Sequence, residues 1–137
     1  MLFRSHSVIE VDDCLIGIEE NKAIMETVIG FIEKYNIAVY DEINHMGLVR
    51  NVLIRKGFVT GELMVCIVIN GDKLPHSNKL VDSLLKAAKI NSISYNVNTA
   101  KSNVILGEKE ENLYGDKYIY DYIDDIRFRI SAKSFSL

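Results

Sequence analysis

This sequence of 137 residues has few cysteines, no long hydrophobic run and no excess of positive charge. Its two cysteines, Cys14 and Cys66, cannot form a disulfide framework, which favours a reducing compartment. No apolar segment approaches the roughly 20 residues that a membrane helix needs. The opening MLFRSHSVIEVDD lacks the apolar core of a signal peptide. We therefore expect a cytoplasmic protein that makes no membrane contact.

The charge balance excludes a protein that coats nucleic acid by bulk attraction. Sixteen Lys and Arg residues face nineteen Asp and Glu residues, for a net charge of -3 and a pI near 5.6. Any RNA contact must come from a local basic patch. The candidates are Arg50, Arg55, Lys56 and Lys101, with Arg127, Arg129 and Lys133 near the end of the chain. For each one taken singly, a solubilising surface charge is the alternative.

Catalytic motifs are also missing. The sequence holds no Gly-rich phosphate loop, no GxSxG and no HExxH, and its three histidines show no metal-ligand spacing. Cys66 lies in the most apolar stretch and is expected in the core. Cys14 has no CxxC partner, so from the residues alone it is either a free thiol or an isolated ligand. The residues by themselves predict a soluble α+β domain without a catalytic constellation.

Apolar spacing predicts two amphipathic helices on one face of a sheet. The first lies within residues 14–37, where Gly30 is a weak position. Its buried stripe is Ile24, Val28, Phe31, Ile32 and Tyr35. The second spans residues 72–89, with Pro75 in its first turn. Its buried stripe is Val81, Leu84, Leu85 and Ala88.

The strands are predicted to be mainly antiparallel. Residues 48–55 and 62–69 form a hairpin around Gly57 and Gly61, and the second of these strands should lie centrally because it is apolar on both faces. Residues 92–98 alternate between apolar and polar side chains. A charged loop is predicted at residues 108–117. A last hairpin at residues 118–131 turns at Asp124 and Asp125.

The stretch VNTAKSNVILGEK, Val97 to Lys109, has the pattern of a strand, a polar turn and a second strand. Its turn gathers amide, hydroxyl and ammonium groups. Asn98, Lys101 and Asn103 are candidate RNA contacts, with Lys101 on a phosphate. Asparagine is also a common turn residue for conformational reasons alone, which is the alternative for Asn98 and Asn103.

Four stretches of the chain resemble one enzyme family in order and spacing. They are FRSHSVIEVDDCLI at 3–16, the segment from YDEINHMG to DKLPH at 40–76, the segment from SISYNVN to KYIYD at 92–121, and FRISAKSF at 128–135. The family is the S-adenosylmethionine-dependent RNA (uracil-5-)-methyltransferases, which make 5-methyluridine in ribosomal or transfer RNA. The resemblance implies a central domain at residues 1–126. It also implies that residues 127–137 are a first strand leading into a Rossmann-like catalytic domain.

The resemblance also implies what a complete enzyme would need besides this segment. The family's Gly-rich cofactor loop, nucleophilic cysteine and carboxylate base have no counterpart in these residues, so the chain alone is predicted to be inactive. Cys14 aligns with the fourth ligand of a [4Fe–4S] cluster found in many members, whose other three cysteines are absent here. Phe135 matches an aromatic residue near the target base. Ala132 and Leu137 depart from the family's proline and glutamine.

Two hypotheses follow for the function of this chain. The first is a part of an RNA methyltransferase that positions RNA and packs against the other domains, while the complete protein transfers a methyl group from S-adenosylmethionine to C5 of uridine. The second is a stand-alone scaffold domain that binds RNA or protein without catalysis. An independent small enzyme has no residue constellation to support it. Exposed strand edges also predict self-association.

Overall fold

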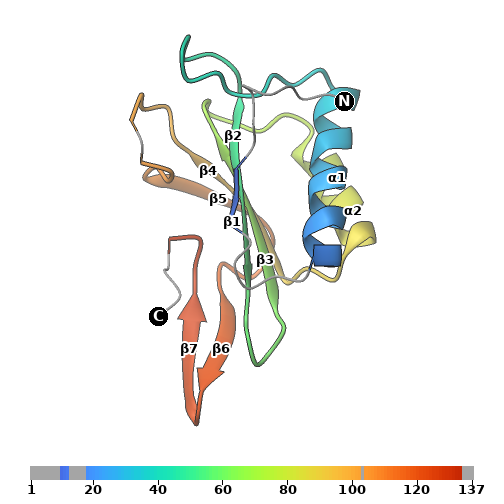
Figure 1. Cartoon of the computed structure of the whole chain (residues 1–137), viewed down its shortest axis with the longest axis vertical. Helices are drawn as coiled ribbons and strands as arrows, with labels where there is room; N and C mark the ends of the chain where they lie inside the picture. The colour runs from blue at the N-terminus through green and yellow to red at the C-terminus, as the bar shows by residue number, and fades with distance from the viewer. Residues whose placement is uncertain (1–9, 13–17, 103, 134–137) are drawn as a thin grey trace.

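A computed structural model describes residues 10–12, 18–102 and 104–133. Two helices pack on one face of a five-stranded sheet, and a two-stranded hairpin projects beside the other face (Figure 1). In chain order the elements are β1 Glu10–Asp12, α1 Ile18–Lys34, β2 Val49–Lys56, β3 Leu63–Ile69, α2 Ser77–Ala87, β4 Ser92–Val97, β5 Lys109–Gly115, β6 Ile119–Ile123 and β7 Ile126–Ile130. The predicted α+β class with two helices is confirmed.

The sheet has the strand order β1-β2-β3-β4-β5. The pairs β2/β3 and β4/β5 are antiparallel, as is β6/β7. The pairs β1/β2 and β3/β4 are parallel, because a helix connects each pair and returns the chain to the same end of the sheet. Every residue of β3 is buried, which confirms its predicted central position.

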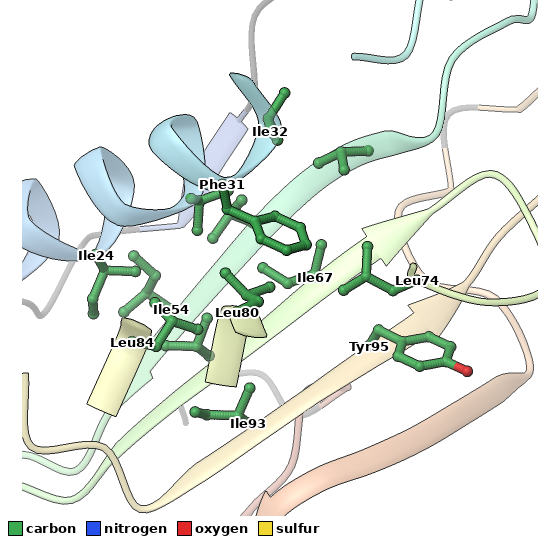
Figure 2. Packing of buried hydrophobic residues seen from close by; sticks show 14 of the residues in the cluster. Ile24, Phe31, Ile32, Ile54, Ile67, Leu74, Leu80, Leu84, Ile93 and Tyr95 are labelled. Carbon is green, nitrogen blue, oxygen red and sulfur yellow. The ribbon is translucent and has the colours of Figure 1, made fainter. Parts of the chain in front are cut away.

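The helices cover the sheet with apolar stripes. The α1 stripe largely follows the prediction, whereas α2 buries Leu84 and the unpredicted Leu80 and leaves Val81, Leu85 and Ala88 partly buried. Ile24 and Phe31 of α1 and Leu84 of α2 are buried against the strands, and Figure 2 shows them over the part of the sheet that carries Ile54 of β2 and Ile67 of β3. Pro75 lies before α2 rather than in its first turn, because His76 precedes the helix with a left-handed backbone (φ 56°). Within the described residues, neither helix has the length and hydropathy needed to cross a bilayer.

Gly30 is an exposed residue inside α1, and a Cβ atom built on it would meet nothing within 4 Å. Replacing Gly30 with Ala is therefore expected to raise the free energy of unfolding by about 0.5–1 kcal/mol, measured by urea denaturation. Gly61 is the matched control. It also has open space around it, but its φ of +73° disfavours alanine, so Gly61→Ala should give no gain. Equal gains at both positions would contradict this account.

The structure corrects the sequence prediction between residues 104 and 117. Residues 104–107 form no strand, although Val104, Ile105 and Leu106 are apolar. The predicted charged loop at 108–117 is instead mostly β5, which pairs with β4. β5 is an edge strand with only Leu113 packed against the core. Charged side chains are common on edge strands because they discourage pairing with another chain, and this masked the strand pattern.

Candidate nucleic-acid interface

The sheet face opposite the helices carries the candidate site, and we call it the loop face. It is formed by Leu53, Met64, Cys66 and Val68. Two segments cover it. Leu106 comes from the loop at residues 98–107, and Ile119, Ile130 and Ala132 come from the β6–β7 hairpin and the residues after it. The 98–107 loop, which precedes β5 in the sequence, and the β6–β7 hairpin, which follows it, therefore pack on the same face of the sheet.

Two asparagines, Asn96 of β4 and Asn98 directly after it, fix the path of the 98–107 loop. The Asn96 side chain accepts a hydrogen bond from the Gly107 N–H (2.7 Å) and donates one to the Gly107 carbonyl (3.2 Å). The Asn98 amide donates to the carbonyls of Val104 (2.7 Å) and Ile105 (2.9 Å) and accepts from the Ala100 N–H (3.1 Å). Each polar side-chain atom of Asn98 is thus used inside the loop. The RNA contact predicted for Asn98 stays a prediction, and the observed role of this residue is structural.

Arg50 braces the same loop from β2. Its Nη1 donates to the carbonyl oxygens of Asn98 (2.8 Å) and Ala100 (2.7 Å), and its guanidinium lies 4.0 Å from the centre of the Tyr40 ring. These bonds hold the residue that precedes Lys101, whose side chain is exposed. The structure therefore brings Arg50 close to the Lys101 turn, and it uses Arg50 to shape that turn.

The other predicted RNA contacts do not join this pair. Arg55 lies five residues further along β2, about 16 Å away, and donates to the Ala132 carbonyl (3.1 Å). Lys56 faces the helix side, where its Nζ lies 2.6 Å from the Glu20 carboxylate. The basic residues therefore form no single patch. The predictions for Asn103, Phe135 and Cys14 concern residues outside the described part of the chain.

Asp121 fastens the β6–β7 hairpin to the β2–β3 turn. Its carboxylate accepts hydrogen bonds from the N–H groups of Phe58 (2.7 Å), Val59 (2.7 Å) and Thr60 (3.3 Å), and its exposed fraction is 5%. Burial alone would raise the pKa of Asp121. The backbone N–H bonds outweigh that effect and hold its pKa below the usual value. The carboxylate thus stays charged at neutral pH and orients the hairpin.

Cys66 is not suited to bind a metal or to attack a substrate. It lies on β3 without solvent exposure, and burial raises the pKa of its thiol to about 12 despite a hydrogen bond with Ser94. Among the described residues, no group of three or more His, Cys, Asp or Glu side chains is placed to hold a metal ion. These residues do not fit an iron–sulfur cluster, and we assign no step to one.

The sequence analysis missed a row of tyrosines on the hairpin. Tyr118, Tyr120 and Tyr122 alternate with the buried Ile119 and Asp121. The predicted hairpin turn at Asp124 and Asp125 is confirmed. The alternation in YIYDY was visible in the sequence, and reading it with period two would have placed all three rings on one side.

Comparison with known proteins gives a class for this arrangement. No protein-family model matches the chain. A curated protein of Halalkalibacterium halodurans, named as an uncharacterised RNA methyltransferase, is 44% identical over 133 residues. A protein of Clostridium acetobutylicum with the same description is 39% identical over 133 residues. Each match covers 96% of this chain and 29% of the relative. The chain is therefore similar to one segment of RNA methyltransferases, and it spans less than a third of their length.

A solved structure makes the similarity more specific. The tRNA (uracil-54, C5)-methyltransferase of Pyrococcus abyssi, in complex with S-adenosyl-L-homocysteine, superposes with a TM-score of 0.72 and 27% identity. The match covers 94% of this chain and 31% of that protein. The family resemblance noted in the sequence is confirmed by these comparisons. The domain boundary at residue 126 stays a prediction. In the structure, β6 before this position pairs with β7, which begins at it.

Proposed function

We propose that this chain is the RNA-positioning segment of an S-adenosylmethionine-dependent methyltransferase that modifies C5 of uridine in ribosomal or transfer RNA. The observation that carries the proposal is the match to RNA methyltransferases over 96% of the chain. The uracil-C5 specificity is supported by the structural neighbour, which is a tRNA (uracil-54, C5)-methyltransferase. S-adenosylmethionine would supply the methyl group, and the described residues of this chain would hold and orient the RNA.

The test of the proposed reaction uses RNA transcribed with uridine that carries tritium at C5. Methylation at C5 replaces that hydrogen, so it releases tritium into water, whereas methylation elsewhere does not. The protein encoded by the complete reading frame that contains this segment is expected to release tritium when S-adenosylmethionine is present. The 137-residue chain alone is expected to release none. Methyl transfer without tritium release would overturn the C5 assignment, and no transfer at all would favour the stand-alone scaffold domain.

Lys101 is the sharpest test of RNA positioning by the 98–107 loop. Its ammonium group is exposed beside a turn that Arg50 and Asn98 hold in place. Lys101→Ala is expected to weaken RNA binding several-fold and to lower the slope of log K against log salt by about 0.7, the value for one phosphate contact on a single strand. Fluorescence anisotropy with a labelled RNA measures both quantities.

The matched control for Lys101→Ala is Lys86→Ala. Lys86 is also exposed, but it lies on α2, on the opposite side of the sheet (Figure 1). Both variants remove one positive charge, so a general charge effect would appear in both. If the two variants bind RNA with the same affinity and the same salt slope, Lys101 makes no phosphate contact.

A further inference from the structure

The β6–β7 hairpin carries a ladder of alternating tyrosine and arginine side chains. The strand register places Tyr120 opposite Arg129 and Tyr122 opposite Arg127, so all four lie on one face of the hairpin. The Arg127 guanidinium lies 4.0 Å from the centre of the Tyr120 ring, and the Arg129 guanidinium lies 4.6 Å from the centre of the Tyr118 ring. Each arginine therefore packs over the tyrosine that lies two residues before the one directly opposite it.

The opposite face of the hairpin explains why this ladder points away from the sheet. Ile119 is fully buried on the loop face, and Asp121 binds the β2–β3 turn. Two further bonds near the ladder involve only the backbone of Tyr120, whose carbonyl accepts from the Thr60 hydroxyl (2.6 Å) and whose N–H donates to Glu62 (2.8 Å). Figure 1 shows β6 and β7 projecting beyond the sheet. The ladder is therefore anchored, with Tyr122, Arg127 and Arg129 exposed and Tyr118 and Tyr120 partly buried.

The two arginines keep their hydrogen-bonding capacity for a ligand. Within the described residues, neither guanidinium forms an ion pair or a hydrogen bond, and both side chains are exposed. The N–H donors of arginine lie in the plane of the guanidinium, so stacking over a tyrosine ring leaves them free for phosphate oxygens. The nearest acidic residues in the sequence, Asp124 and Asp125, are confined to the turn at the tip. A chain with a net charge of -3 thus presents, beside aromatic rings, positive charge that no described residue pairs with.

We infer that the hairpin face formed by Tyr118, Tyr120, Tyr122, Arg127 and Arg129 binds single-stranded RNA. Unpaired bases stack on tyrosine rings and on guanidinium planes, while the arginine N–H groups bind the phosphates between them. A duplex keeps its bases stacked inside, so it can use only the phosphate contacts. The inference deepens the proposed function, on which it rests, by naming the form of RNA and the residues that receive it.

The experiment compares three variants of the full 137-residue chain with the wild type by fluorescence anisotropy, with a labelled 12-nucleotide single-stranded RNA as the probe. In the Arg127→Ala, Arg129→Ala double variant, binding is expected to weaken at least tenfold and the salt slope to fall by about 1.4, the value for two phosphate contacts. Tyr122→Ala should weaken binding at least fivefold, because stacking on one ring is lost, with an unchanged salt slope. Tyr122→Phe should restore the affinity, because it restores the ring.

The control is a Lys79→Ala, Lys86→Ala double variant, which removes the same charge from exposed positions on α2. Thermal unfolding followed by circular dichroism checks that each variant folds. Equal weakening by the α2 variant, equal affinity for a matched duplex, or an unchanged affinity of the arginine variant would each overturn the inference. Tritium release by the protein encoded by the complete reading frame is a separate readout. RNA binding through the hairpin without tritium release would support this inference and overturn the proposed reaction. Tritium release without RNA binding through the hairpin would support the proposed reaction and overturn this inference.

Discussion

Replacing Asp121 with Asn is expected to lower the free energy of unfolding by about 2–3 kcal/mol, which is a large effect for one isosteric change. The carboxylate accepts three backbone N–H groups from the β2–β3 turn, and an amide would turn an NH₂ group toward donors that need an acceptor. Urea denaturation measures the loss. Asp125→Asn is the matched control, because it removes the same charge from an exposed position on the same hairpin and should change stability by less than about 0.5 kcal/mol.

Acid should reproduce the effect of the Asp121 substitution. Because the folded state holds the pKa of Asp121 below the usual value of about 3.9, the carboxylate contributes its full stabilisation above that value and loses it as the pH falls through the folded pKa. The difference between wild type and Asp121→Asn should therefore be constant from pH 5 to pH 7 and shrink below about pH 4. A difference that does not change down to pH 2 would contradict the role assigned to the charged form.

Replacing Gly107 with Ala is expected to cost about 2–3 kcal/mol and to displace the 98–107 loop. A Cβ atom on Gly107 would lie 1.9 Å from the Val97 carbonyl oxygen, which is backbone and cannot turn aside. The shift would break the paired hydrogen bonds between Gly107 and the Asn96 side chain. Thermal unfolding measures the cost, and Thr99→Ala, at an exposed position in the same loop, is the control.

A double-mutant cycle separates the loop contact from general strain. Asn96→Ala removes the same pair of hydrogen bonds from the other side. If Gly107→Ala acts by breaking that pair, the two substitutions together should cost clearly less than the sum of their separate effects. Fully additive costs would show that Gly107 is needed for another reason. Because the loop carries Lys101, the Gly107 variant should also weaken RNA binding in the anisotropy assay.

The sequence predicts the helix side of this fold well and the loop side poorly, for a physical reason. The α1 stripe and the doubly apolar β3 follow from spacing, because burial against a sheet requires a regular pattern. β5 was missed because an edge strand needs only Leu113 to face the core. Val104 to Leu106 have the pattern of a strand, yet the Asn98 side chain binds the carbonyls of Val104 and Ile105. The Asn96 side chain binds the adjacent Gly107, so the segment is held as a loop.

The candidate site shows the same division. The basic residues and the last hairpin were found from the sequence, but their contacts were not. Arg50 reaches carbonyls 48 and 50 residues away, and Asp121 reaches N–H groups 61 to 63 residues away. Such pairings depend on where the end of β4 lies relative to β2, and on where the hairpin lies relative to the β2–β3 turn, and no local pattern reveals either. The exposed Phe58 likewise becomes a neighbour of Asp121 only in the folded chain, where its N–H donates to that carboxylate.

The separate pairing of β6 with β7 gives the molecule two rates of hydrogen exchange. The amides of β3 have hydrogen-bonded strands on both sides and exchange only when the whole sheet opens. The hairpin amides pair across β6 and β7, and the Tyr120 N–H donates to Glu62, so they can exchange by a local opening that breaks the Asp121 and Glu62 contacts and leaves the sheet intact. Deuterium would therefore enter the tyrosine–arginine ladder long before it enters the central strand, and a ligand held by that ladder would slow the first rate without changing the second.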